Sequence, residues 1–215
     1  MERKTKTAAL FDFDGTLIRG DSVVRFVLFA LRRGAMPRRD IPGVIAFALF
    51  GKLGLCPMER VKERALRFEK NLPRPEKEKL CRDFAALVLM PALFPEGRKA
   101  WDSLKAAGRT MVLASASTSD YMEYVAERLG ADALICTRLS EDGKAGPNCR
   151  GEEKARRAAA WATENGADLK LSDAYGDSGG DIPLLRLCGR AHAVNPKRKL
   201  KKEAARRGWE VLNWR

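Results

Sequence analysis

The segment Leu10-Phe11-Asp12-Phe13-Asp14-Gly15-Thr16-Leu17 determines how the rest of the chain can be interpreted. An apolar run from Ala8 leads into two carboxylates spaced two residues apart, and a Gly-Thr pair then allows the chain to turn. Because residues i and i+2 of an extended chain share a face, Asp12 and Asp14 are expected to point the same way. This pattern predicts two carboxylates at the carboxyl edge of an open α/β sheet, where ligands bind.

Two carboxylates this close repel each other, and their burial without a counter-charge costs several kcal/mol or raises a pKa. The arrangement therefore favours a cation, and Mg²⁺ is the natural candidate because it prefers oxygen ligands and is usually held by one or two carboxylates plus phosphate. The alternative is an ordinary turn that caps the next helix, since Asp and Gly are common turn residues. The residues further along the chain favour the first interpretation.

The composition is that of a globular protein. With 215 residues, 45% of them hydrophobic and 32% charged, the chain can form one α/β domain with an insertion or two small domains. The net charge of +13 favours anionic partners without choosing among phosphate compounds, nucleic acid and membranes. Five scattered cysteines predict reduced thiols. No signal-peptide pattern is present, and the uncharged, strongly apolar stretch 41–51 is too short to span a bilayer, so a cytoplasmic location is expected.

The order of predicted elements indicates the architecture. Apolar residues at helical spacing predict four helices and no strand between the first strand and residue 90, at 23–33, 41–55, 58–70 and 76–90. After residue 96 helices alternate with short apolar strands at 110–114, 133–136, 169–175, 191–194 and 210–212. This alternation is typical of a parallel sheet covered on both faces. We therefore expect a core of residues 1–19 and 91–215 and a helical cap of residues 20–90.

Three further candidate sites follow at strand ends or a helix start. Ser115 comes directly after the strand at 110–114 and can offer a hydroxyl to a phosphate oxygen. Lys154 lies in the first turn of a predicted helix and offers a compact positive charge. Asp177 follows a strand between glycines, and Asp181 comes four residues later. Taken singly, each has an ordinary alternative: a loop, a solvated lysine or a helix cap.

In this order the motifs resemble the haloacid dehalogenase superfamily of hydrolases. The resemblance covers nearly the whole chain, and the helical insert indicates the phosphoserine-phosphatase-like branch, subfamily IB. The matching residues are Asp12-Phe13-Asp14-Gly15-Thr16, Ser115, Lys154 and Gly176-Asp177-Ser178-x-x-Asp181. The resemblance implies a Rossmann-like, doubly wound parallel sheet with an inserted helical cap.

The resemblance also implies a Mg²⁺-dependent phosphatase that acts on a small phosphorylated substrate. Asp12 would be the nucleophile that forms an aspartyl phosphate, and Asp14 the general acid and base. Magnesium would be bound by the Asp12 carboxylate, the Asp14 carbonyl and Asp177. Asp181 would support these magnesium ligands. The phosphate oxygens would be held by Ser115 and Lys154, together with the loop at Gly15 and Thr16.

The residues of the predicted cap do not decide the identity of the substrate. Asp21 and Arg64 are the cap residues that the resemblance assigns to reading the substrate, although Asp21 is shorter than the glutamate expected there. The apolar stretch 41–55, preceded by four arginines, also allows a phosphatidylglycerophosphate-type lipid phosphatase and a peripheral membrane contact. The simpler interpretation, which we favour, is that this stretch is the core helix of the cap. Phosphoryl transfer in place of hydrolysis, and the oligomeric state, also stay open.

The basic segment 196–207 has two interpretations. It carries seven Lys or Arg residues against one Glu. A nucleic-acid or lipid patch and a solvated helix face would both produce this pattern. Because no nucleic-acid motif surrounds it, a non-enzymatic nucleic-acid-binding module is the weaker alternative and no nucleic acid is expected as a partner. His192 is expected to be structural.

Overall fold

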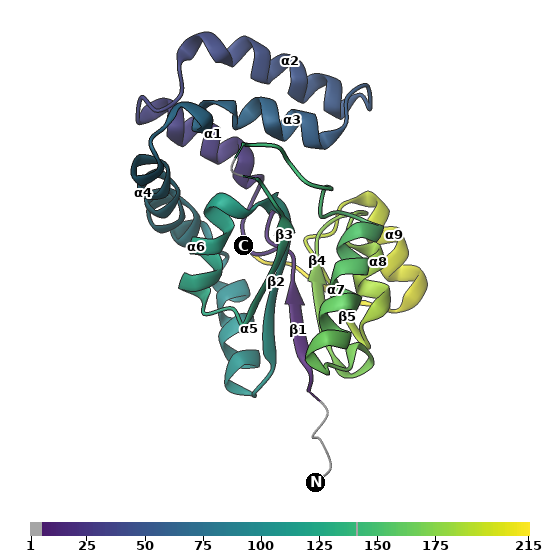
Figure 1. The fold of residues 1–215 in the computed structure, drawn as a ribbon. Coiled ribbons are helices and arrows are strands. Elements are labelled where there is room, and N and C mark those ends of the chain that lie inside the picture. The colour runs from purple at the N-terminus through teal and green to yellow at the C-terminus, as the bar shows by residue number, and fades with distance from the viewer. Residues whose placement is uncertain (1–5, 141) are drawn as a thin grey trace.

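A parallel sheet forms the centre of the molecule. In residues 6–140 and 142–215, which this computed structural model describes, six strands lie in the order β3-β2-β1-β4-β5-β6, and every pair is parallel (Figure 1). The strands are β1 (Ala8–Phe11), β2 (Thr110–Thr118), β3 (Ala133–Thr137), β4 (Asp173–Gly176), β5 (Arg190–Val194) and β6 (Glu210–Leu212). β1 lies between β2 and β4, so the chain runs outward to β3 on one side of β1 and then crosses to run outward from β4 to β6 on the other side. Such a switch point creates a crevice at the carboxyl edge of the sheet.

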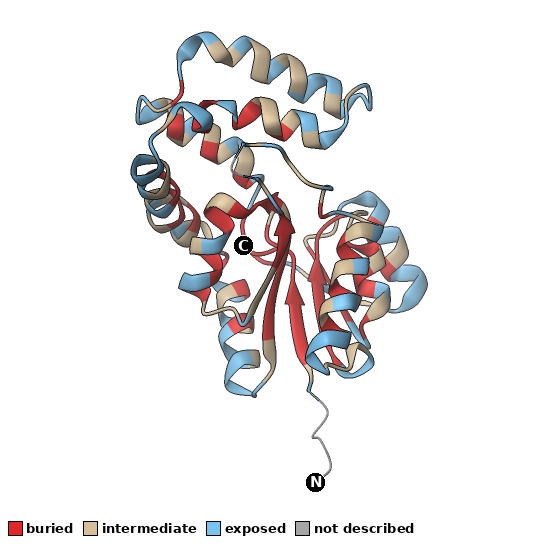
Figure 2. Cartoon of the chain, viewed as in Figure 1, coloured by how far each residue is buried: buried red, intermediate tan, exposed pale blue. Residues whose placement is uncertain are grey.

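Both faces of the sheet are covered, as the alternation of apolar side chains in β1 requires. Ala9 and Phe11 belong to one apolar cluster, and Ala8 and Leu10 belong to another. The first cluster includes α5 (Pro95–Ala106) and α6 (Ser119–Leu129); the second includes α7 (Glu152–Asn165), α8 (Ile182–Leu187) and α9 (Arg198–Arg207). Figure 2 shows the central strands β1, β2 and β4 almost wholly buried between these helices. The predicted doubly wound α/β class is confirmed.

A helical segment connects β1 to β2. It contains α1 (Ser22–Arg32), α2 (Ile41–Lys52), α3 (Met58–Ala65) and α4 (Arg74–Phe84), with short 3₁₀ or π turns at Arg38–Asp40, Arg67–Asn71, Ala85–Leu89 and Met90–Ala92. α1 is capped by Asp21, whose carboxylate accepts hydrogen bonds from the amides of Val23 and Val24. Phe26 of α1 is fully buried in the same apolar cluster as Phe11 of the sheet. In the described ranges 6–140 and 142–215, no helix is long and apolar enough to cross a membrane.

Three predicted elements have different ends in the structure. The predicted strand at 169–175 is wrong in its first half, which is a 3₁₀ turn at Leu169–Leu171, because Asp168 accepts a hydrogen bond from the Lys170 amide. The predicted helix at 58–70 ends at Ala65. β2 continues four residues beyond the predicted Ala114, with a register shift against β3.

The register of the central strands determines which residues reach the crevice. Phe11 is paired with Leu113 on one side and with Tyr175 on the other. The residues that follow each of these three therefore come to the same edge of the sheet, and the site is built there.

Candidate active site

Asp12 is placed by the last hydrogen bond of β1. Its amide donates to the Tyr175 carbonyl at 3.0 Å, so Asp12 still follows the direction of the strand. The chain then turns, with the Leu17 amide donating to the Phe13 carbonyl at 2.9 Å. Thr16 lies inside this turn, and its hydroxyl donates to Asp12 Oδ2 at 3.0 Å. The turn therefore fixes one oxygen of the carboxylate from behind.

Lys154 connects the two acidic motifs. Its Nζ donates to Asp12 Oδ1 and to Asp181 Oδ1, each at 2.7 Å, and the residue is 1% exposed. Burial alone would lower the pKa of Lys154, but the charges of Asp12 and Asp181 outweigh it and raise that pKa. The lysine is thus held as a cation beside Asp12.

Asp177 completes a cluster of carboxylates. Single carboxylate oxygens of Asp12, Asp177 and Asp181 all lie within 4.8 Å of one another, and all three residues are buried. Gly15 has φ +84°, and a Cβ on it would lie 2.2 Å from Asp177 Oδ2. Only glycine allows the turn after Asp12 to approach Asp177 this closely.

The charges of this cluster are not balanced by the side chains that contact it. Lys154 contacts Asp12 and Asp181, and Lys197 Nζ pairs with Asp177 Oδ2 at 2.5 Å, so two ammonium groups face three carboxylates. Burial, then the charge of Asp181, raises the pKa of Asp12 to about 8. A divalent cation would relieve this excess of negative charge. Carboxylate oxygens are also the donors that a hard ion such as Mg²⁺ prefers, so the residues fit such an ion.

Asp14 occupies a separate position on the cap side of Asp12. Its carboxylate accepts hydrogen bonds from the Ser22 amide at 2.6 Å, from the Ser22 hydroxyl at 3.0 Å and from the Ser117 hydroxyl. Burial, then the charge of Asp21, raises its pKa to about 6. A carboxyl group with this pKa can give and take a proton near neutral pH.

These groups line a cavity of about 560 Å³ between the edge of the sheet and the helices of the cap segment. Asp21 and Val23 line it from the start of α1, and Met58 and Lys62 line it from α3. The cavity is within the size range of small-molecule sites. Its wall is rich in charges of both signs, including the cationic side chains of Arg19, Lys62, Arg150, Lys154 and Lys197.

The structure brings most of the sequence-predicted site residues to this cavity. Asp12, Asp14, Gly15, Asp21, Lys154, Asp177 and Asp181 line it. Thr16 and Ser115 are fully buried just behind the lining, where Ser115 Oγ accepts a hydrogen bond from the Ser117 amide at 3.0 Å. Arg64 is not brought to the cavity, because it lies between α3 and α2 and pairs with Asp40 at 3.4 Å.

Among the residues of the cavity wall that were not predicted as site residues, three make polar contacts that shape the site. Ser117 contacts Asp14, Lys197 contacts Asp177, and Lys62 donates to the Ala116 carbonyl and the Asn148 side chain. A signal existed for Lys197, because it follows the carboxyl end of a predicted strand. Lys62 had none, since its position depends on how α3 lies over the sheet.

The crevice of a doubly wound sheet, with a buried carboxylate cluster at its edge, defines this chain as an α/β protein with a candidate active site at the switch point. The sequence profile described as haloacid dehalogenase-like hydrolase matches residues 9–186, and the chain belongs to this family. The predicted family and the predicted class of enzyme, a hydrolase of the phosphatase type, are thereby confirmed.

Several curated relatives cover nearly the whole chain. An "inhibition of morphological differentiation protein" of Streptomyces azureus is 31% identical over 97% of this chain and 79% of the relative. A phosphoserine phosphatase of Mycobacterium tuberculosis is 30% identical over 97% of this chain and 71% of its own length. A histidinol-phosphatase of Neisseria meningitidis is 29% identical over 98% of this chain and 100% of its own length. The chain is therefore similar to enzymes named for different substrates.

Solved structures share the fold. A protein of unknown function from Bordetella pertussis has a TM-score of 0.85 and 28% identity, and the alignment covers 97% of this chain and 99% of that one. A phosphoserine phosphatase solved as an analogue of its phospho-aspartyl intermediate has a TM-score of 0.67 and 21% identity, covering 98% and 94% of the two chains. At this identity the second match shows the fold alone.

Proposed function

We propose that this protein is a Mg²⁺-dependent phosphatase that hydrolyses a small phosphate monoester through an aspartyl phosphate on Asp12. The observation that carries the proposal is the buried contact of Asp12 with Lys154, beside Asp177 and Asp181, at the bottom of the cavity. A carboxylate nucleophile and a phosphate dianion repel each other, so the reaction needs fixed positive charge at this point.

The first half of the proposed reaction transfers the phosphoryl group to the enzyme. An Asp12 oxygen attacks phosphorus, the bond from phosphorus to the leaving oxygen breaks, and the Asp14 carboxyl group donates its proton to that oxygen. Lys154 holds the phosphate oxygens. The Ser115 hydroxyl also holds a phosphate oxygen, from its position behind the cavity lining. The loop at Gly15 and Thr16 keeps Asp12 in position.

The second half regenerates Asp12. The Asp14 carboxylate takes a proton from a water molecule, whose oxygen attacks phosphorus, and the bond from phosphorus to Asp12 breaks. The hydrogen bonds from Ser22 and Ser117 keep Asp14 at the same place in both halves. Asp12, the Asp14 carbonyl and Asp177 would hold the Mg²⁺, supported by Asp181, and the ion would supply positive charge to the phosphate.

Residues 20–90 are the cap in this proposal, and they face the leaving group. Asp21 is the acidic residue that lines the cavity from α1, and its position suits an ammonium group of the substrate. Relatives named for phosphoserine and histidinol phosphate, both of which carry an amino group, support such a substrate class. A lipid phosphate is the second candidate, because α2 exposes large apolar side chains.

The reaction is tested with p-nitrophenyl phosphate, with and without EDTA. We expect Mg²⁺-dependent release of phosphate, and a loss of at least about a thousandfold in Asp12→Asn. Asp102→Asn, an exposed carboxylate on α5, is the matched control and should keep full activity. Unchanged turnover in the Asp12 variant would refute the assignment.

The substrate is tested by a screen that includes phosphoserine, histidinol phosphate and phosphatidylglycerophosphate. A preference for the amino compounds that is lost in Asp21→Asn supports the first candidate. A preference for the lipid supports the second. Added acceptor alcohols distinguish hydrolysis from phosphoryl transfer.

A further inference from the structure

The α2 helix differs from an ordinary surface helix in which side chains face the protein and which face outward. Gly43 and Gly51 lie on one face and face α3, where a Cβ on Gly43 would lie 2.3 Å from Arg64 and one on Gly51 would lie 2.6 Å from Val61. Ile45 and Leu49 lie on the opposite face and are each 55% exposed. The small residues thus face the protein and the large apolar residues face outward.

α2 has no buried residue along its twelve positions. Figure 2 shows it at the outer end of the molecule without a buried segment. A helix that is apolar all round is normally enclosed by protein or lipid. The apolar surface continues past the end of α2, where Phe50, Leu53 and Leu55 are 47%, 70% and 72% exposed.

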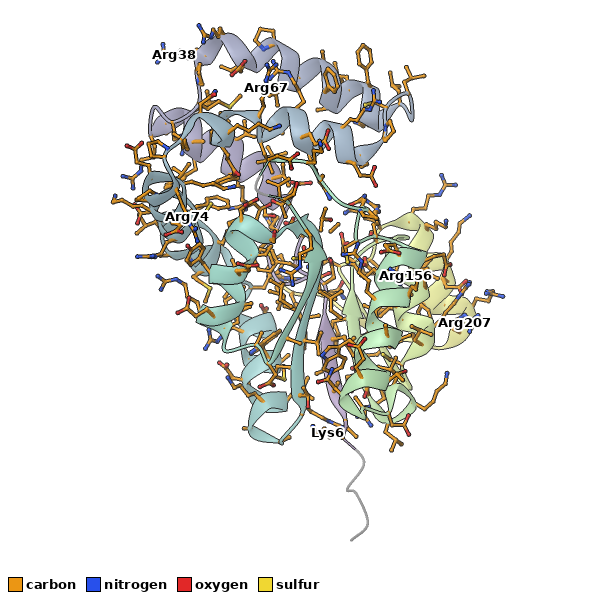
Figure 3. All side chains as sticks on the ribbon, viewed as in Figure 1. Lys6, Arg38, Arg67, Arg74, Arg156 and Arg207 are labelled. Atoms are coloured by element: carbon orange, nitrogen blue, oxygen red, sulfur yellow. The ribbon has the colours of Figure 1, made fainter. Side chains whose placement is uncertain are left out.

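The charges around α2 are positive on the outside. Arg38 and Arg39 precede the helix, Lys52 ends it, and all three are exposed; Figure 3 shows Arg38 at the outer edge of the helical segment. The acidic residues of 38–64 make contacts within the protein. They are Asp40, which pairs with Arg64, Glu59, which accepts from the Asn148 amide, and Glu63, which accepts from the Ala145 amide.

We propose that α2 is a membrane-docking surface, which lies in the interface of a bilayer that contains anionic lipids. An exposed apolar face flanked by arginine and lysine suits acyl chains below anionic headgroups. With twelve residues α2 is about 18 Å long, so it can lie on a bilayer but not cross one. A second copy of this chain fits less well, because it would bring the same basic residues and a further net charge of +13 against them.

The test is flotation with phosphatidylcholine vesicles, with and without about a third of phosphatidylglycerol. We expect the purified protein to float with the vesicles that contain phosphatidylglycerol and not with those of phosphatidylcholine only. The double variants Ile45→Ser/Leu49→Ser and Arg38→Glu/Arg39→Glu should each bind at least about tenfold more weakly. Turnover of p-nitrophenyl phosphate and the thermal midpoint should be unchanged in both.

Two matched controls separate this surface from general effects. Leu87→Ser/Leu171→Ser removes two equally exposed leucines elsewhere, and Lys201→Glu/Lys202→Glu makes the same change of charge on α9. Both should float like the wild type. The proposal is overturned if the wild type stays unbound or if the controls lose binding equally. It is also overturned if the wild type is a dimer that Ile45→Ser/Leu49→Ser dissociates.

Discussion

Asp177 shows how single residues set the state of the site. Its carboxylate is paired with Lys197, a lysine that is 68% exposed at its side chain. An exposed ammonium on a flexible stem is easily displaced, whereas the buried Lys154 is not. In the proposed function Asp177 would hold the Mg²⁺, whose charge would offset this buried carboxylate in place of Lys197.

Magnesium should therefore stabilise the protein. Ion binding to the folded state alone raises the thermal midpoint in proportion to the logarithm of the Mg²⁺ concentration. Asp177→Asn should abolish most of this rise, while Asp102→Asn should leave it unchanged; differential scanning fluorimetry with a Mg²⁺ titration measures both. An equal rise in the Asp177 variant would show that the ion binds elsewhere.

Asp173 is a further buried carboxylate, outside the cluster at the cavity, and its contacts are structural. It forms two hydrogen bonds with Arg190, at 2.6 and 2.7 Å, and contacts His192 at 3.3 Å. His192 also contacts Glu210 and stacks on Tyr175, with ring centroids 4.2 Å apart. The expectation that His192 has a structural role agrees with these contacts.

The Asp173 contacts should make stability depend on pH. Burial alone would raise the pKa of Asp173, but hydrogen bonds from Arg190 and His192 hold it well below its usual range. The folded state therefore binds fewer protons, so this stability is present above the unfolded pKa of about 4 and is lost as the pH falls below it.

We expect Asp173→Asn to lower the free energy of unfolding by about 2 kcal/mol at neutral pH. The loss should shrink as the pH falls below about 4. Urea denaturation across this range measures it. Asp102→Asn, which removes an exposed ion pair with Arg98, should change stability by less than about 1 kcal/mol. A loss in Asp173→Asn that is independent of pH would contradict the account.

At the scale of elements, α3 attaches the cap segment to the sheet. Lys62 donates to the carbonyl of Ala116 near the end of β2, to the side chain of Thr137 at the end of β3, and to the side chain of Asn148 in the connection after β3. Burial lowers its pKa to about 8. Arg64, two residues later, points away toward α2. On the same helix, therefore, the Lys62 side chain points to the cavity and the Arg64 side chain points away from it.

Lys62→Met and Arg64→Met form a matched pair. We expect Lys62→Met to lower kcat/KM by about tenfold or more, because Ala116 and the neighbouring Ser117 lose the contact that positions them beside Asp14. Arg64→Met should change kcat/KM by less than about twofold. Steady-state kinetics of the two variants measure both changes in kcat/KM. An equal or larger loss in Arg64→Met would favour the role that the family resemblance assigned to Arg64.

The predictability of the site follows from which elements carry it. Asp12, Asp177 and Lys154 come from strand ends and a helix start, and the rule that parallel strands share one carboxyl edge brings them together. The place of Ser115 behind the cavity wall was not predictable, because β2 continues past it to Thr118. The place of Lys62 depends on the packing of helices in the cap, for which the periodicity of a single helix holds no information.

At the scale of the whole molecule, the cap segment and the sheet share one apolar cluster. The Phe26 ring in α1 lies 4.8 Å from Phe84 in α4 and 5.0 Å from Tyr121 in α6, measured between centroids. The same cluster extends to Trp101 and Phe11. The apolar residues of the helical segment and of the layer beside the sheet therefore pack as a continuous unit.

This continuity predicts a single unfolding transition. Phe26→Ala should lower the free energy of unfolding by about 3 to 5 kcal/mol, whereas Val24→Ala, which is 58% exposed on the same helix, should change it by less than about 0.5 kcal/mol. Fluorescence from the four tryptophans, which lie outside residues 20–90, and helical circular dichroism should change together. Separate midpoints for the two signals would show that the cap segment unfolds independently.

The central claim is that Asp12 carries the phosphoryl group during the reaction. It is tested by acid quench of the enzyme during turnover with Mg²⁺ and substrate, followed by borohydride reduction, which converts an aspartyl phosphate to homoserine and leaves free carboxylates unchanged. Mass spectrometry of the peptides should find homoserine at position 12, and only in samples that received substrate. An active enzyme with homoserine at another aspartate, or with none, would contradict the account.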